Sequence, residues 1–394
     1  MSARRITILG ATGSVGQNTV DLIAREPDAY HVVALTGHSN VEVLARDAVR
    51  LRADVAVTAR GDKLDELRER LAGTGVEAAA GDAAVWEAAE RPADWTMNGI
   101  VGAAGLVPSL RALTHGGTLA LANKESLVCA GSILLAEADR HGGTVLPVDS
   151  EHSAVFQALV GEDRADVEKI TLTASGGGLR DWPVARLREA SPADAGSHPN
   201  WDMGQRITID SASMFNKAME LIEAQVLFGL PPHRIEALIH PQSAVHALVQ
   251  FRDGAIMAHL GAPDMRHAIG YALNWPRRRH LPVERLDLAA LARLDFSRPD
   301  PERYPALALA QRVMATGGLA GAAFNAAKEA ALDLFIEGRI AFTGMAPLVG
   351  ATLDRLGAAV EGDALSLDMV LEMDAAARAA AFALGDEGGR ERWT

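Results

Sequence analysis

A glycine-rich turn near the start of the chain constrains its fold more than any other feature. The sequence Gly10-Ala11-Thr12-Gly13-Ser14-Val15-Gly16 lies between an apolar run at residues 6–9 and a helical pattern at residues 15–25. Glycines at this spacing let the backbone turn sharply and approach a pyrophosphate, which the N–H groups of the following helix can bind. Residues 10–16, which we call the nucleotide turn, therefore predict the first βαβ unit of a dinucleotide-binding domain.

Short apolar runs continue to residue 150 and alternate with amphipathic segments. Further strands are predicted at residues 31–35, 54–58, 96–100, 118–122 and 145–148, and helices at residues 41–51 and 126–138. Strands that alternate with helices in this way are typical of a doubly wound parallel sheet. The predicted fold class is therefore α/β, with a Rossmann-like N-terminal domain.

The pattern changes after residue 150. A strand at residues 170–173 and a hairpin at residues 245–260, with Asp253-Gly254 in its turn, predict a central α+β domain. Four helical patterns between residues 304 and 384 predict a C-terminal helical bundle, beyond which the last ten residues are expected to fray. The predicted domains are residues 1–150, 151–275 and 303–394, with a proline-rich and arginine-rich linker at residues 276–302.

The end of the second strand indicates which nucleotide is bound. NAD sites usually place Asp or Glu there, to bind the ribose 2′-hydroxyl. This chain has Thr36-Gly37-His38-Ser39-Asn40 instead, without an acid and without Lys or Arg. His38, Ser39 and Asn40 are therefore candidate cofactor contacts, and NADP is favoured over NAD.

Two carboxylates follow the predicted strand at residues 145–148, in the sequence Asp149-Ser150-Glu151. Residues two apart in an extended segment point the same way, and neighbouring carboxylates repel unless a cation or proton lies between them. This segment, which we call the acidic segment, is either a metal site or the acidic start of a helix. Glu220 could supply a third oxygen ligand, and such a ligand set favours Mg²⁺ or Mn²⁺.

A second group of polar residues is suited to a phosphate. Ser175 precedes three glycines, and Asp210-Ser211-Ala212-Ser213 resembles a cap for a helix that continues to about residue 228. Asn216 and Glu220 would share one face of that helix, with Lys217 at its border. Serine hydroxyls, an amide and a lysine are suitable phosphate donors.

Composition excludes several classes of protein. The formal charge of −13 disfavours nucleic acid as a partner, and the single cysteine, Cys129, rules out a disulfide within the chain. No apolar stretch reaches the ~18 residues that a membrane helix needs. We therefore expect a soluble, cytoplasmic protein without a membrane partner.

Seven motifs together resemble the 1-deoxy-D-xylulose 5-phosphate reductoisomerase family, over essentially the whole chain and in the expected order. The first four are the nucleotide turn, Ala122-Asn123-Lys124-Glu125-Ser126-Leu127-Val128, Pro147-Val148-Asp149-Ser150-Glu151-His152-Ser153 and Thr173-Ala174-Ser175-Gly176-Gly177. The other three are His198-Pro199-Asn200-Trp201-Asp202-Met203-Gly204, Asp210-Ser211-Ala212-Ser213-Met214-Phe215-Asn216-Lys217-Ala218-Met219-Glu220 and His240-Pro241-Gln242-Ser243.

The resemblance implies an NADPH-dependent and metal-dependent rearrangement and reduction of a phosphorylated ketose, in a homodimer that uses Mg²⁺, Mn²⁺ or Co²⁺. It implies the metal ligands Asp149, Glu151 and Glu220, with Lys124 also in the catalytic site. The implied substrate contacts are Lys124, Ser150, Glu151, Ser175, His198, Ser211, Asn216, Lys217 and Glu220. The implied cofactor contacts include Thr12, Gly13, Ser14, Val15, Asn40, Asn123, Glu125 and Gly204, and a lid would carry Trp201 and Met203.

Two other interpretations of the sequence are open. A metal-independent, NADP-linked dehydrogenase of the semialdehyde or homoserine type would explain the first domain, but it would leave the three carboxylates without a role. A nucleotide-sensing protein would bind NADPH without turnover. Full activity after exhaustive chelation would favour the dehydrogenase.

Overall fold

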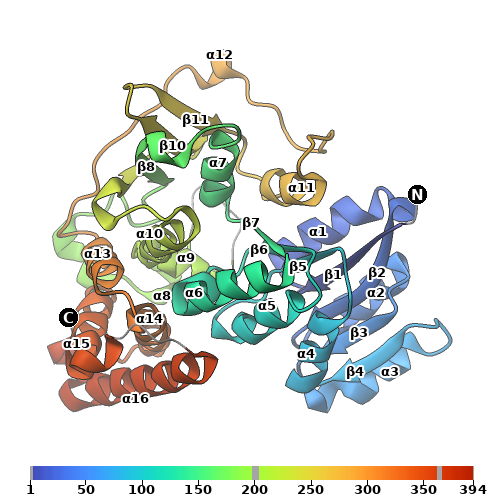
Figure 1. Ribbon diagram of the computed structural model, residues 1–394. Coiled ribbons are helices and arrows are strands. Elements are labelled where there is room, and N and C mark those ends of the chain that lie inside the picture. The colour runs from blue at the N-terminus through green and yellow to red at the C-terminus, as the bar shows by residue number, and fades with distance from the viewer. Residues whose placement is uncertain (1–2, 198–203, 362–365, 394) are drawn as a thin grey trace. The chain divides into compact units, whose positions relative to one another are not determined.

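The computed structural model describes residues 3–197, 204–361 and 366–393, which group into two compact units (Figure 1). The first unit comprises Met1–Ser126, Leu134–Ser153 and Asp264–Val283, and the second comprises Leu127–Ile133, Ala154–Pro263 and Glu284–Thr394. The chain passes between the units several times, so neither unit is a single stretch of sequence. The sequence predicts a different division, into residues 1–150, 151–275, 276–302 and 303–394, and this division stays a prediction.

The first unit is built on a seven-stranded parallel sheet with the strand order β4-β3-β2-β1-β5-β6-β7. Its strands are Arg4–Leu9 (β1), Tyr30–Gly37 (β2), Val55–Thr58 (β3), Glu77–Ala80 (β4), Trp95–Asn98 (β5), Thr118–Leu121 (β6) and Thr144–Pro147 (β7). The α/β prediction is confirmed. Because successive strands are added in opposite directions from β1, the sheet has a topological switch point between β1 and β5, where such sheets bind ligands.

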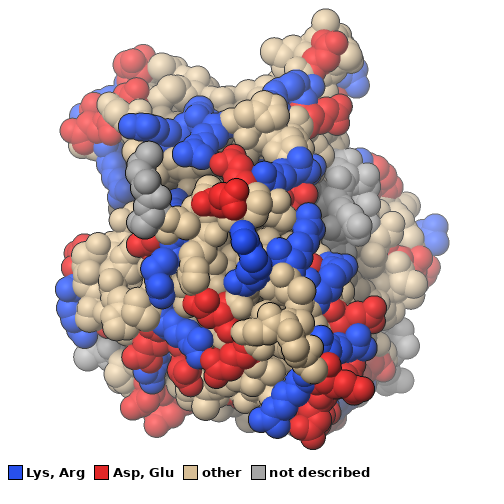
Figure 2. All heavy atoms as spheres, turned by 90° about the vertical axis from the view of Figure 1, so that its right-hand side faces the viewer, with Lys and Arg blue, Asp and Glu red and all other residues tan. Residues whose placement is uncertain are grey.

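Helices cover the sheet along its length (Figure 1). Those that begin in the first unit are Ser14–Ala24 (α1), Val41–Leu51 (α2), Leu64–Leu71 (α3), Asp82–Glu90 (α4), Leu106–Ala112 (α5), Lys124–His141 (α6), Ser150–Ala158 (α7) and Arg266–Asn274 (α11). Consecutive residues of β1, from Ile6 to Leu9, are all buried, because a parallel sheet is covered on both faces. On the face drawn in Figure 2, acidic and basic side chains are interspersed.

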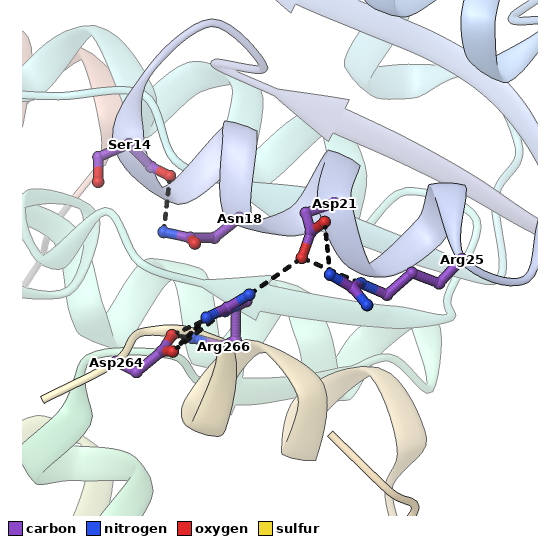
Figure 3. A network of polar contacts seen from close by, with 6 residues as sticks. All are labelled: Ser14, Asn18, Asp21, Arg25, Asp264 and Arg266. Atoms are coloured by element: carbon purple, nitrogen blue, oxygen red, sulfur yellow. Dashed lines mark hydrogen bonds and ion pairs between the residues drawn. The ribbon is translucent and has the colours of Figure 1, made fainter. Parts of the chain in front are cut away.

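Segment 264–283 is held to the first unit by specific polar contacts. The indole Nε1 of Trp95 donates to the carbonyl oxygen of Ala272 at 3.1 Å. Arg266, at the start of α11, pairs with Asp264 at 2.7 Å and with Asp21 of α1 at 3.3 Å (Figure 3). Asp21 also pairs with Arg25, so a chain of alternating charges joins α11 to the helix that follows the nucleotide turn.

Arg266→Met is expected to lower the free energy of unfolding at pH 7 by about 1 kcal/mol, since it removes two partly exposed ion pairs. Burial alone would raise the pKa of Asp264, but hydrogen bonds and Coulombic attraction from Arg266 outweigh it and lower that pKa below 3.8. The pKa of Asp21 is lowered in the same way, by Arg25 and Arg266. Depressed carboxyl pKa values stabilise the fold above the unfolded value, and this stabilisation is lost as pH falls through the folded value.

Urea unfolding between pH 7 and pH 3 measures this effect. The difference between the two proteins should shrink once the pH is below 3.8, whereas a constant difference would mean that only packing was lost. Arg25→Met is a useful comparison, because among the described residues the ion pair of Arg25 is with Asp21 and its side chain is half exposed, so its pH-dependent difference should be smaller than that of Arg266→Met.

The second unit contains a four-stranded mixed sheet with the order β11-β10-β8-β9. Its strands are Val167–Ala174 (β8), Ile235–Ile239 (β9), Val245–Phe251 (β10) and Ile256–Leu260 (β11). The predicted hairpin is confirmed as the antiparallel pair β10 and β11, and Gly254 has the positive φ of 89° that its turn requires. β9, which the sequence analysis missed, pairs in parallel with β8.

Helices make up the rest of the second unit. They are Pro192–Ala195 (α8), Gln205–Ala212 (α9), Phe215–Phe228 (α10), Leu288–Leu291 (α12), Ala306–Thr316 (α13), Ala320–Ile336 (α14), Met345–Leu356 (α15) and Leu367–Arg392 (α16). The expectation that the last ten residues fray is wrong, because α16 continues to Arg392. Trp393 is buried, and its indole donates to the carbonyl oxygen of Leu384 at 3.0 Å. Among the described residues, no helix is long and apolar enough to span a membrane.

Candidate active site

The nucleotide turn depends on glycine for close backbone packing. Gly10 has a φ of 77°, and a Cβ atom there would lie 2.7 Å from the carbonyl oxygen of Gly99, just beyond β5. A Cβ atom on Gly16 would lie 2.2 Å from the carbonyl oxygen of Gly10. At Gly13, in contrast, the nearest atom would be 3.5 Å away and the residue is exposed. The turn is therefore tightly packed on the protein side and open at the start of α1.

The start of α1 can accept an anion. Its N-cap residue, Gly13, provides no side-chain cap, and its first turn contains no acidic residue. The free N–H groups and the positive end of the helix dipole thus have no competing partner from a capping or acidic side chain of that turn. Ser14 is exposed beside them, while Thr12 and Val15 are partly buried.

Three residues that the sequence analysis did not single out as site residues fix the nucleotide turn. Thr36 accepts two hydrogen bonds from it, one from the Gly10 amide at 3.0 Å and one from the Ala11 amide at 2.6 Å. Gln17 donates to the carbonyl oxygen of Ala11 at 2.9 Å and to Asp47 of α2 at 2.6 Å. Nothing in the local pattern distinguishes Gln17 or Asp47, because their partners come from other elements.

The end of β2 lies beside the nucleotide turn. A Cβ atom on Gly37 would lie 3.0 Å from the Cγ2 atom of Thr12, and His38, Ser39 and Asn40 beyond it are exposed. Asn40 also caps α2, since its Oδ1 accepts from the Val43 amide at 3.2 Å. The position that would carry the acid of an NAD site is occupied by this exposed turn without an acidic residue, which suits a phosphate.

Asn123 joins the ends of β5 and β6. Its amide nitrogen donates to the carbonyl oxygens of Ile100 at 2.7 Å and Gly102 at 2.8 Å, and its Oδ1 caps α6 by accepting from the Ser126 amide at 3.0 Å. It is 2% exposed, and its amide nitrogen also contacts a carboxylate oxygen of Glu125 at 2.9 Å. The side chain of Asn123 therefore holds the loops at this edge of the sheet.

The carboxyl ends of β6 and β7 bring Lys124 and Asp149 together. The strands are neighbours in register from Thr118 with Thr144 to Leu121 with Pro147, and the Lys124 ammonium forms an ion pair with the Asp149 carboxylate. Both side chains are largely buried, which strengthens their attraction. A cationic donor thus lies directly beside one of the predicted metal ligands.

The acidic segment is not extended. The metal-site interpretation of the sequence assumes an extended segment, in which Asp149 and Glu151 point the same way. Ser150 begins α7, and the Asp149 carbonyl oxygen accepts from the Ser153 amide at 2.9 Å. The Ser150 hydroxyl donates to Glu151 at 2.6 Å. The segment is therefore the start of a helix at the end of a strand, and this position is compatible with either role that the sequence left open.

In the second unit, Ser175 and Ser211 belong to two backbone segments that touch. The Ser175 hydroxyl accepts from the Gly177 amide at 3.1 Å, and a Cβ atom on Gly177 would lie 2.4 Å from the Cα atom of Ala212. The predicted helix cap at residues 210–213 is wrong. Asp210 and Ser211 lie inside α9, and α10 begins only after Met214, which has a φ of 61°.

Asn216, Lys217 and Glu220 lie together on α10, as their spacing predicted. The Asn216 amide and the Lys217 ammonium both donate to the Glu220 carboxylate. The Lys217 and Glu220 side chains are 4% and 1% exposed, so each charge depends on the other for its stabilisation. These three residues offer a carboxylate that could hold a cation and donors that could hold an anion.

The remaining predicted site residues are His198, Trp201, Met203 and Gly204. His198, Trp201 and Met203 lie outside the described residues. Gly204 is exposed and is the N-cap residue of α9.

Three family models match the chain. One described as 1-deoxy-D-xylulose 5-phosphate reductoisomerase matches residues 6–131, and two described as C-terminal domains of that reductoisomerase match residues 145–228 and 260–380.

Curated proteins and solved structures are also similar over nearly the full length. The 1-deoxy-D-xylulose 5-phosphate reductoisomerases of Jannaschia sp. (strain CCS1) and Ruegeria pomeroyi are each 66% identical to this chain over 377 residues. The matched region is 95% of this chain, 96% of the Jannaschia protein and 95% of the Ruegeria protein. The Zymomonas mobilis reductoisomerase in complex with NADPH has a TM-score of 0.91 and 46% identity, and covers 98% of this chain and 99% of its own. A reductoisomerase structure with NADPH, fosmidomycin and magnesium has a TM-score of 0.92 and 39% identity, with 97% and 98% covered.

Proposed function

Because the chain belongs to the 1-deoxy-D-xylulose 5-phosphate reductoisomerase family, we propose that it converts this ketose phosphate into 2-C-methyl-D-erythritol 4-phosphate. The reaction uses NADPH and a divalent metal ion and belongs to isoprenoid-precursor biosynthesis. The observation that carries the proposal is the 66% identity that extends over 95% of the chain.

The nucleotide turn is the proposed site of the NADPH pyrophosphate. Its open helix start would receive the phosphates at Thr12, Gly13, Ser14 and Val15. The exposed turn at His38, Ser39 and Asn40, which has no acidic residue, would receive the 2′-phosphate. Asn123, Glu125 and Gly204 complete the proposed contacts, although the Asn123 amide is already engaged in holding the loops together.

Asp149, Glu151 and Glu220 are the proposed ligands of the metal, which is Mg²⁺, Mn²⁺ or Co²⁺. Three carboxylates are a suitable oxygen ligand set for such an ion. When bound, the metal would act as a Lewis acid on the ketone and as a template for the substrate. Lys124 already lies against Asp149, and it is therefore placed to donate a hydrogen bond to a substrate oxygen beside the metal ligands.

The substrate phosphate would be held by Ser175, Ser211, Asn216 and Lys217. These residues offer two hydroxyls, an amide and an ammonium, and the ammonium is already buried among apolar neighbours of α10, where its charge is weakly screened. Ser150 and His198 would bind the carbon skeleton. Trp201 and Met203 would form a lid that keeps water from the aldehyde that the rearrangement would yield before hydride transfer from NADPH.

The metal-independent dehydrogenase is not favoured. It gives no catalytic role to the carboxylates of Asp149, Glu151 and Glu220, and the similar proteins are reductoisomerases. A nucleotide-sensing protein is disfavoured for the same reason.

A homodimer is the proposed assembly. β11 is an edge strand of the second sheet, and its Ile256 and Leu260 side chains are 57% and 37% exposed. Exposed apolar edge strands pair readily with another chain, so a second copy is a fitting partner. A monomer in sedimentation at micromolar concentration would contradict this assignment. The cytoplasm is the proposed compartment, because a lone cysteine suits a reducing environment.

A spectrophotometric assay tests the function. We expect 1-deoxy-D-xylulose 5-phosphate to cause oxidation of NADPH in the presence of Mn²⁺, and exhaustive chelation to stop it. Full activity after chelation would support the dehydrogenase, and NADPH binding without turnover would support the sensor.

A further inference from the structure

A buried ion pair that the proposed mechanism does not use lies beside Ser211. Asp210 is 7% exposed and lies inside α9, one residue before Ser211. Its Oδ2 atom accepts a hydrogen bond at 2.9 Å from the ammonium of Lys328, which is 5% exposed and belongs to α14. The two residues are separated by 118 positions in the sequence.

The desolvation of a buried ion pair costs free energy, so a gain in stability alone is a poor explanation for such a pair. Burial raises the pKa of Asp210, and the ammonium of Lys328 is the main group that counteracts this shift. Because desolvation can exceed the Coulombic gain, replacing a buried ion pair with apolar residues of similar size is often neutral or stabilising. A specific position of the backbone is therefore a better explanation for this pair than added stability.

The backbone that the pair fixes is the one that carries the proposed phosphate ligands. α9 ends at Ala212, the chain reverses at Met214 with its φ of 61°, and α10 begins at Phe215. The Met214 amide donates to the carbonyl oxygen of Ser211 at 3.2 Å. A shift of Asp210 would therefore move Ser211 and would be transmitted to the first turn of α10, where Asn216 and Lys217 lie.

Two further contacts restrict the position of this segment. Gly177 packs against the backbone of Ser211 and Ala212, with its virtual Cβ atom 2.9 Å from the Ser211 carbonyl oxygen. Arg206, one turn earlier on α9, forms an ion pair with Asp333, which is also on α14. α14 thus holds α9 at two points, and the buried point is the one next to Ser211.

We propose that Lys328 is a positioning residue for the substrate phosphate, which acts by holding Asp210 and, through it, Ser211 and the start of α10. This inference rests on the proposed function, since it concerns the same phosphate site. It assigns a role in substrate binding to a helix of the C-terminal region that contributes none of the proposed ligands.

Lys328→Met tests this role, because it removes the charge and keeps a long apolar side chain. The KM for 1-deoxy-D-xylulose 5-phosphate should rise about 10-fold, equivalent to about 1.4 kcal/mol. The kcat value should change less than about 3-fold, and the dissociation constant of NADPH should be unchanged. The dissociation constant of inorganic phosphate, measured by calorimetry with Mn²⁺ present, should rise in parallel with KM.

Two further variants separate positioning from stability. In Asp210→Asn combined with Lys328→Met, neither charge is left unpaired, so stability should recover while KM stays high. Arg378→Met is the matched control, because it removes a partly buried cation that pairs with Glu329 of α14 and with Asp374 of α16. Its KM should match that of the original protein.

Unchanged KM and phosphate binding in Lys328→Met, or an equal rise in Arg378→Met, would overturn the proposal. A KM that recovers together with stability in the double variant would also overturn it. If the original protein binds phosphate but does not turn over the substrate, the proposed function fails, and weaker phosphate binding in Lys328→Met would still support the positioning role.

Discussion

Glu220→Gln is expected to reduce kcat with 1-deoxy-D-xylulose 5-phosphate by at least about 1000-fold, while NADPH still binds. The substitution keeps the size of the side chain and removes the negative charge that a divalent cation requires. A 1000-fold loss corresponds to about 4 kcal/mol of transition-state stabilisation, which is of the order that one charged group beside a Lewis acid supplies. Asp149→Asn should have a similar effect, since it removes another proposed ligand.

The measurements must distinguish a lost metal site from a damaged fold. Glu220→Gln leaves the buried ammonium of Lys217 without its carboxylate, so some loss of stability is expected and thermal unfolding has to be measured. Turnover is then assayed below the unfolding temperature over a range of Mn²⁺ concentrations, and NADPH binding is followed by fluorescence. Weaker metal binding with intact NADPH binding is the expected combination.

Glu137→Gln is a matched control on α6. Glu137 is a partly buried helical carboxylate that pairs with Arg140 and His141, and it is not among the proposed ligands. Its turnover should be normal. Near-normal turnover of Glu220→Gln or Asp149→Asn at saturating Mn²⁺ would refute the assignment of that residue as a metal ligand.

The sequence predicted those parts of the fold that depend on local signals. The nucleotide turn, α2 and the hairpin of β10 and β11 are specified by glycines, caps and apolar runs within a few residues of one another. The prediction of a helix cap at Asp210 is wrong because α9 continues past this residue. The chain reverses at Met214 in a left-handed conformation, which methionine rarely adopts and which the sequence therefore does not predict.

The C-terminus shows the same limit. Fraying of the last ten residues is the ordinary expectation for a chain terminus, whereas α16 continues to Arg392. A Cβ atom on Gly385 would lie 2.6 Å from the Cδ1 atom of Leu334, so this glycine allows α16 to pack closely against α14. Leu334 is 51 positions away in the sequence, so no local pattern around Gly385 reveals that glycine is needed there. The pairs of Gln17 with Asp47 and of Asp210 with Lys328 are likewise not visible in the local sequence.

Within the candidate site, contacts between residues of one helix were easier to predict than contacts between residues of different elements. The spacing of Asn216 and Glu220 on one helix is a local property, and their contact is confirmed. The pairing of Lys124 with Asp149 depends on β6 and β7 being neighbours, which strand periodicity alone does not specify. The contact between the Ser175 turn and α9 likewise depends on tertiary structure. A substitution at this contact, Gly177→Ala, is expected to have a large effect on activity.

Gly177→Ala is expected to lower kcat/KM for the ketose phosphate by about 100-fold, mainly through KM. The new Cβ atom would lie 2.4 Å from the Cα atom of Ala212 and 2.8 Å from its amide nitrogen, and neither backbone atom can rotate away. Ser175 and Ser211 must therefore move apart, and a displacement of about 1 Å in a binding site can cost about 100-fold. The clash and the positive φ of 71° should together lower the free energy of unfolding by about 2–4 kcal/mol.

Gly176→Ala separates the clash from the backbone strain. Gly176 has a φ of 85°, so alanine is strained there to a similar degree, but the nearest atom to its Cβ would be the Cδ atom of Arg180, at 2.8 Å. That atom belongs to a side chain, which can move more readily than backbone, although its guanidinium donates to the carbonyl oxygen of Ser175 at 2.8 Å. The loss in kcat/KM should therefore be about 10-fold smaller than for Gly177→Ala. Equal losses in the two variants would show that backbone strain alone accounts for the effect. Only a larger loss at Gly177, with NADPH binding intact in both, would support a phosphate site formed by two backbone segments in direct contact.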